Sequence, residues 1–159
     1  MPGAVTEGGL HINEATGLCT DYLNRFNEAV MLLELLPSMP DSIEDFLAWR
    51  PCGYAEHFAN SNFKNRDAVI AAYKAADPAA RKALDGLADT MNVMLLATRD
   101  AMKRDPHAGS TDALAQAALA WVKPHVTRAG LVINGVRVEE ARTTGVSAAQ
   151  AAVDALFEN

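Results

Sequence analysis

Cysteine is scarce in this sequence. The 159 residues include 2 cysteines, Cys19 and Cys52, which do not form the C-x-x-C pair that many zinc and dithiol sites use. In a reducing compartment, isolated cysteines of this kind are ordinary buried thiols, and we expect that state here.

Basic charge and long apolar runs are limited as well. The chain has 14 Lys and Arg residues against 20 Asp and Glu residues, which gives a net charge of −6. Nucleic-acid-binding proteins usually carry a basic face, so no nucleic-acid partner is expected. No segment approaches the roughly 18 apolar residues of a membrane span, and the first residues lack the pattern of a signal peptide. We therefore expect a cytoplasmic protein without membrane contact.

Motifs for catalysis and for metals are missing. The sequence contains no G-x-S-x-G element and no glycine-rich phosphate loop. Its 4 histidines, at positions 11, 57, 107 and 125, form neither an H-x-x-x-H nor an E-x-x-H unit, the spacings with which helices present metal ligands. We expect no metal, no cofactor and no catalytic set, although histidines from separate helices could still converge.

One stretch of the chain has clear limits at both ends. Asp77 suits an N-cap and Pro78 the first helical position, whereas Lys103 and Arg104 suit the last turn and Pro106 disfavours helix just before it. The residues that recur with helical spacing in between are Leu84, Leu87, Ala88, Met91, Met94, Leu95, Thr98 and Met102. This pattern predicts one amphipathic helix about 40 Å long.

Further helices are predicted before this one. Apolar spacing predicts a helix from Glu14 or Thr16 to Leu36. Three short helical segments follow at residues 42–49, 54–60 and 66–76. Asp41, with Glu44 in a capping box, and Asn65 are their expected N-caps. Short helices are marginal alone, so these segments must pack on the long helices.

Another helix is predicted after Pro106, with Ser110 or Thr111 as its N-cap. A proline, Pro124, interrupts its pattern. The helix therefore either ends near Val122 or kinks and continues to Ala129.

In the C-terminal part of the chain the helical spacing of apolar residues gives way to residues that favour β-strands. Residues 131–133 and 136–138 are β-rich triplets on either side of Asn134-Gly135, a strong signal for a tight hairpin turn. Ser147 then suits the N-cap of a last helix, and Gln150 completes its capping box. We predict a small β-hairpin followed by a helix.

These elements together predict an all-α protein, a helical bundle with several short connecting helices and a small C-terminal β-hairpin plus helix. We expect residues 1–13 to be a flexible lead-in and residues 14–130 to form the bundle domain. Residues 131–159 would be a hairpin–helix tail, packed on the bundle or exchanged between subunits.

The candidate binding residues lie around His57. In a helix over residues 54–61, Tyr54 and Ser61 share the face of His57, with Glu56 beside it and Arg66 close in sequence. Such a cluster could bind an anion, or it could serve acid–base chemistry with His57 as the titrating group. Alternatively, His57 and Tyr54 are half-buried and bond to backbone groups at the ends of broken helices.

Two functional hypotheses follow. The segments VMLLELL (residues 30–36) and VMLLA (residues 93–97) are apolar nearly all round, which is typical of helices covered on several sides. The leading hypothesis is a non-catalytic protein-interaction or scaffolding module that self-associates as a homo-oligomer. The alternative is a small ligand- or metal-binding bundle enzyme, in which Tyr54, Glu56 and His57 meet Asp89 or Asn92 in a pocket.

Overall fold

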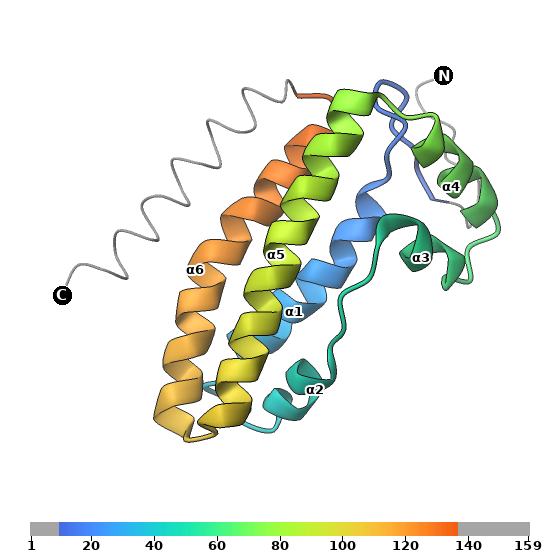
Figure 1. The fold of residues 1–159 in the computed structure, drawn as a ribbon. Coiled ribbons are helices and arrows are strands. Elements are labelled where there is room, and N and C mark those ends of the chain that lie inside the picture. Colours follow the sequence, from blue (N-terminus) through green and yellow to red (C-terminus); the bar gives the residue numbers. More distant parts are fainter. Residues whose placement is uncertain (1–9, 137–159) are drawn as a thin grey trace.

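The fold is a bundle of three long helices with short helices along one side (Figure 1). The computed structural model describes residues 10–136. The long helices are α1 (Asn24–Leu35), α5 (Pro78–Arg104) and α6 (Ala108–Ile133). The short ones are η1 (Thr20–Leu23), α2 (Ser42–Ala48), α3 (Tyr54–Ala59) and α4 (Arg66–Lys74). No strand occurs in residues 10–136, so the predicted all-α class is confirmed.

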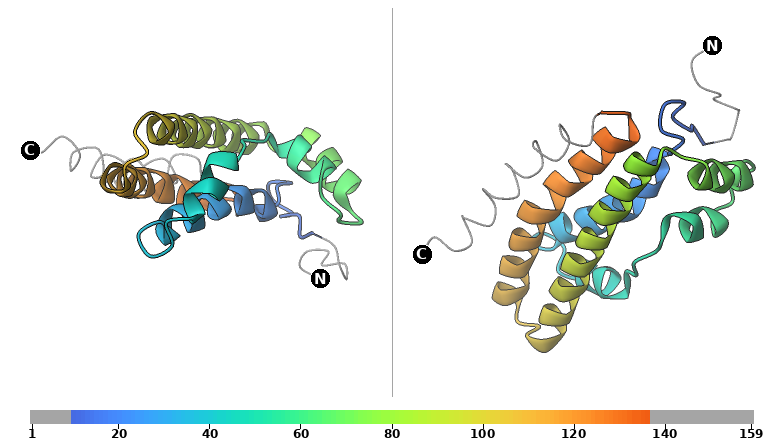
Figure 2. Two further views of the ribbon diagram at one scale, coloured as in Figure 1. Left: turned by 90° about the horizontal axis from the view of Figure 1, so that it is seen from below. Right: turned by 45° about the horizontal axis from the view of Figure 1, so that its top comes forward.

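Helix α6 packs against both α5 and α1, and the three together enclose most of the core (Figure 2). The α3–α4 pair extends from the bundle near the start of α5 (Figure 2). The largest fully buried side chains include Phe26, Phe46 and Phe58, one each from α1, α2 and α3. Helices α2 and α3 are thus each anchored by one large apolar side chain, as expected for helices too short to be stable alone. None of the helices in the described part of the chain is long and apolar enough to cross a membrane.

The limits of α5 are the predicted ones. The Asp77 carboxylate accepts a hydrogen bond from the backbone N–H of Ala80 at 3.0 Å, and Pro78 occupies the first helical position. Lys103 and Arg104 lie in the last turn. Both ends are fixed by contacts within a few residues, which is why the sequence was sufficient to place them.

Helix α1 begins later than the sequence predicts. The Asn13 side chain accepts hydrogen bonds from the backbone N–H groups of Ala15 and Thr16 at 2.9 and 3.1 Å, which forms a turn instead of a helix. Gly17 then has φ +78°, and a Cβ there would lie 3.2 Å from the Ala72 carbonyl oxygen. The predicted helix start at Glu14 or Thr16 is wrong because this local turn satisfies the backbone groups instead.

Two predicted N-caps also have other roles. Asp41 has a helical backbone, φ −67° and ψ −16°, and its side chain makes no capping hydrogen bond, so the expected capping box with Glu44 is absent. The Asn65 side chain accepts from the N–H of Leu10 and donates to its carbonyl, both at 2.9 Å. Asn65 therefore holds the segment around Leu10 against α4 instead of capping that helix.

Helix α6 starts earlier than predicted. Its N-cap is His107, whose Nδ1 accepts a hydrogen bond from the Gly109 N–H at 3.2 Å, so Ser110 and Thr111 are not the cap. The helix also passes through Pro124 and continues to Ile133, beyond either predicted end. The packing of α6 against α1 and α5 outweighs the hydrogen bond that the proline removes.

The predicted hairpin is not supported by the residues that the structure describes. Its expected first strand, residues 131–133, is the last turn of α6. Gly135 has φ +90° and donates to the Val132 carbonyl at 3.1 Å, and Val136 donates to the Leu131 carbonyl at 2.9 Å. This is the Schellman motif, in which a glycine of positive φ ends a helix. Asn-Gly suits both a hairpin turn and a helix end. Here it ends a helix, because residues 131–133 are part of α6. Residues 137–159, including the predicted last helix from Ser147, lie outside the described residues.

Candidate functional site

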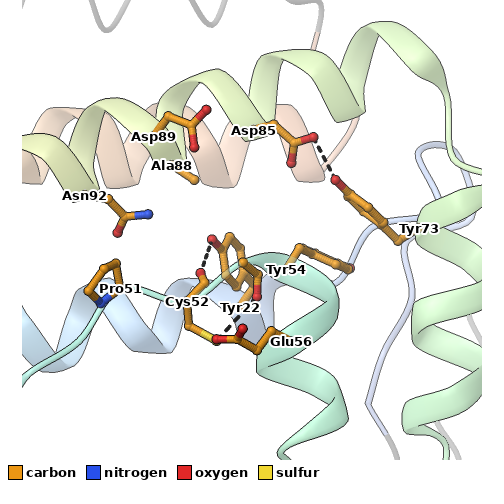
Figure 3. Close-up of a pocket in the computed structure, with 11 residues that line it drawn as sticks. Tyr22, Pro51, Cys52, Tyr54, Glu56, Tyr73, Asp85, Ala88, Asp89 and Asn92 are labelled. Carbon is orange, nitrogen blue, oxygen red and sulfur yellow. Dashed lines mark hydrogen bonds between the residues drawn. The ribbon is translucent and has the colours of Figure 1, made fainter.

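A cleft of about 510 Å³ opens between α5 and the segment that leads into α3 (Figure 3). We call it the acid–tyrosine cleft, because carboxylates and tyrosines dominate its lining. The residues that line it are Tyr22, Pro51, Cys52, Gly53, Tyr54, Glu56, Tyr73, Asp85, Ala88, Asp89 and Asn92. It therefore joins side chains from η1, α3, α4 and α5 with the loop before α3.

The α5 wall follows from helical spacing. Asp85, Asp89 and Asn92 stand at positions i, i+4 and i+7, so they form one stripe along the helix. The adjacent face carries the buried residues Leu84 and Met91, which hold the stripe against the bundle. The cleft thus has a polar wall on a rigid helix.

The opposite wall is fixed by two reciprocal tyrosine hydrogen bonds. The Tyr22 hydroxyl donates to the Cys52 carbonyl at 2.8 Å, and the Tyr54 hydroxyl accepts from the Cys19 N–H, also at 2.8 Å. Both rings are buried, and their centroids lie 5.2 Å apart in an edge contact. Each tyrosine comes from the segment that the other one bonds to, so η1 and the start of α3 are locked together.

Tyr73 connects α4 to α5 at the far end of the cleft (Figure 3). Its hydroxyl donates to Asp85 Oδ2 at 2.7 Å, and its ring stacks on Tyr54 with centroids 4.5 Å apart. Burial, and then the hydrogen bond to the Asp85 carboxylate, raise the pKa of Tyr73 to about 12. The phenol is therefore a neutral hydrogen-bond donor at pH 7.

The thiol in the cleft is also protonated. Burial, and then a hydrogen bond to the Glu56 side chain, raise the pKa of Cys52 to about 11. Burial likewise raises the pKa values of Tyr22 and Tyr54. A thiol is a weak nucleophile, so Cys52 is unsuited to covalent catalysis. The formal charge of the lining comes from Glu56, Asp85 and Asp89 alone.

The predicted site residues divide into two groups. Tyr54 and Glu56 line the cleft together with Asp89 and Asn92. His57 is not part of the lining. Its Nε2 lies 3.2 Å from Asp21 Oδ2.

Ser61 and Arg66 lie beyond the end of α3 and not at the cleft. The Ser61 hydroxyl donates to the Phe58 carbonyl at 2.7 Å, and Arg66 donates to the Ser61 carbonyl at 2.8 Å. These are bonds between side chains and backbone carbonyls near the end of a short helix. The predicted five-residue cluster is therefore not one site in the structure.

Sequence reasoning missed Tyr22, Tyr73 and Asp85. They come from η1, α4 and α5, and they reach one cleft only through the packing of separate elements. One feature of the sequence did point to Asp85. Asp85 and Asp89 are like charges at i and i+4, a pair that destabilises an isolated helix.

A second hollow, of about 450 Å³, lies between α1 and α6. Its charged residues are of opposite sign, and Lys123 Nζ lies 3.5 Å from Glu34 Oε2. Because these charges compensate each other, this hollow lacks the one-sided charge of the acid–tyrosine cleft.

No group of three or more His, Cys, Asp or Glu side chains in residues 10–136 has the geometry to hold a metal ion. Comparisons of the chain with protein families, curated proteins and solved structures found no match. The functional argument therefore rests on the geometry of the cleft.

Proposed function

We propose that this protein binds a small, positively charged organic ligand in the acid–tyrosine cleft. The observation that carries the proposal is the lining, in which three carboxylates and three tyrosines meet and no Lys, Arg or His takes part. Carboxylates attract a cation directly, and tyrosine rings add a cation–π contribution where they are accessible.

The carboxylates of the cleft, Glu56, Asp85 and Asp89, have no salt-bridge partner among the described residues. The guanidinium groups of Arg25 and Arg81 bond to the backbone carbonyls of Arg50 and Lys74, both at 3.0 Å, and not to a cleft carboxylate. They keep their positive charge, and the Arg81 guanidinium lies 5.7 Å from the centre of the Tyr73 ring. Like charges that share a concave site repel each other, and a bound cation would relieve this repulsion.

Binding is a better account of the cleft than catalysis. Its thiol and phenols have raised pKa values and stay protonated at neutral pH. No nucleophile activated by a base is present in the lining. Neutral donors and fixed carboxylates can orient a ligand without reacting with it.

Isothermal titration calorimetry at constant ionic strength tests the proposal with an alkylammonium, a guanidinium and a carboxylate compound of similar size. We expect the cations to bind and the anion not to bind. Asp89→Asn should weaken cation binding, whereas Asp100→Asn, an exposed position on the same helix, should not. If no cation binds, or if both variants behave alike, the proposal is wrong.

A stability measurement separates lost binding from lost folding. Asp89→Asn removes a like-charge i, i+4 pair from α5, so the free energy of unfolding of the ligand-free protein should rise by about 0.2–0.5 kcal/mol. A variant that is more stable but binds the cation less well cannot be explained by misfolding.

Self-association remains a second proposal, favoured by two exposed apolar side chains. Val93 on α5 is 69% exposed and Met31 on α1 is 51% exposed, and each lies in one of the two segments that are apolar all round. Sedimentation velocity at micromolar concentrations tests it. A dimer in the unmodified chain that dissociates in Val93→Lys would support it, and a monomer throughout would contradict it.

A further inference from the structure

The hydrogen-bond acceptors that α5 contributes to the cleft are arranged in a row along the helix. Asp85, Asp89 and Asn92 extend over seven residues of one stripe, which is about 10 Å along the helix axis. The two carboxylates are about one turn apart, or roughly 6 Å along the axis. Asp85 has one oxygen bonded to Tyr73, and its second oxygen has no such partner in the cleft. A ligand that satisfies this row must be extended.

The amide at the end of the row gives an independent indication. Asn92 Oδ1 is buried and has no hydrogen-bond partner among the described residues. A buried acceptor without a partner is unfavourable, so an atom of this kind needs an explanation such as a bound group. The terminal torsion of asparagine is soft, so the amide can turn toward a ligand without breaking a hydrogen bond at this oxygen. An acceptor needs a ligand that carries N–H groups, which quaternary ammonium compounds lack.

Acceptors are present on both walls of the cleft. Glu56 projects from α3, across from Asp85 and Asp89 on α5 (Figure 3). Between the walls lie apolar surfaces, the Ala88 methyl group and the tyrosine rings. Polar groups at separate points with apolar surface between them complement a chain of methylene groups that carries a cation at each end.

We propose that the occupant of the acid–tyrosine cleft is an aliphatic diamine or a longer polyamine, extended along α5. This inference rests on the proposed function, because it names the class of cation that the cleft takes. One ammonium group is held at Asp85 and the next at Asp89. Asn92 Oδ1 accepts from the second nitrogen of a diamine or from the third nitrogen of a longer polyamine. Charge-assisted hydrogen bonds at two carboxylates favour a dication over a monocation of the same length.

The test compares n-butylamine, 1,4-diaminobutane, spermidine and tetramethylammonium by titration calorimetry at constant ionic strength. We expect 1,4-diaminobutane to bind at least about tenfold more tightly than n-butylamine, because it makes one more charged hydrogen-bonding contact. Tetramethylammonium should bind more weakly than either amine. Equal affinity for the monoamine and the diamine would overturn the inference and leave the proposed function intact. Absence of binding by all four compounds would overturn both.

Variants test which side chain binds each nitrogen of the ligand. Asp89→Asn should reduce the ratio of diamine to monoamine affinity to near one, whereas Asp100→Asn should leave the ratio unchanged. Asn92→Leu should weaken binding of 1,4-diaminobutane and spermidine more than that of tetramethylammonium, which cannot donate to an amide. An unchanged ratio in Asp89→Asn, measured on protein whose melting temperature is not lowered, contradicts the extended pose.

Discussion

Tyr73 on α4 donates a 2.7 Å hydrogen bond to Asp85 on α5, and this bond joins the last short helix to the central long one. The same bond occupies one oxygen of a cleft carboxylate and orients the other. Packing of α4 and the geometry of the ligand site are therefore coupled through a single phenol.

Tyr73→Phe tests this coupling. Loss of the hydrogen bond to a carboxylate should lower the free energy of unfolding by about 1–2 kcal/mol, since the ring and its stack on Tyr54 are retained. Urea unfolding followed by circular dichroism measures the change. Affinity for 1,4-diaminobutane should also fall, because the Asp85 carboxylate is no longer oriented. Unchanged stability would show that the bond contributes nothing net.

The pH dependence of stability should reflect His125, which is 5% exposed and stacks on Trp121. Burial lowers the pKa of His125 below its usual value of 6.5. The unfolded chain therefore takes up a proton at this residue more readily than the folded one, so stability is lost as the pH falls below about 6.5. Urea unfolding at pH 7.5, 6.5 and 5.5 should show this decline, and His125→Gln should show a smaller one. An equal decline in both proteins would rule out His125 as its source.

Asn65 should matter for the segment around Leu10 and not for helix capping. Asn65→Ala removes both hydrogen bonds to Leu10, and we expect a loss of about 1–2 kcal/mol in the free energy of unfolding. Asn62→Ala, at an exposed position in the same loop, is the matched control and should have little effect. Hydrogen exchange should show faster exchange at the Leu10 amide in Asn65→Ala. If that rate does not change, Asn65 is not what protects the amide.

The end of α6 can be distinguished from a hairpin by two substitutions. In the Schellman motif only Gly135 has positive φ, whereas a type I′ hairpin turn needs positive φ at Asn134 as well. Gly135→Ala should therefore cost about 1 kcal/mol, and Asn134→Ala should cost less than about 0.5 kcal/mol. Comparable losses for the two variants, measured by thermal unfolding, would favour the hairpin turn.

Features fixed by neighbouring residues could be predicted from the sequence. Both ends of α5 depend on Asp77, Pro78 and Lys103, which act within one turn of the helix. Sequence motifs that are compatible with two local structures were less reliable. Asn134-Gly135 ends a helix where a hairpin was expected, and the start of α1 is displaced by the turn at Asn13.

The cleft was predictable only in part, for a different reason. Tyr54 and Glu56 were candidates because they lie next to His57 in the sequence, and both line the cleft with Asp89 and Asn92, whereas His57 does not. Tyr22 and Tyr73 reach the same cleft from other helices through packing over long sequence separations. No pattern within a window of neighbouring residues contains that information.

The reciprocal bonds between Tyr22 and the Cys52 carbonyl, and between Tyr54 and the Cys19 N–H, have a kinetic consequence. A wall braced in this way has little conformational freedom left to lose when a ligand arrives, so association needs no slow closing step. In stopped-flow mixing the observed rate should rise linearly with ligand concentration and should not level off. Affinity would then be governed by how fast the ligand leaves the carboxylates.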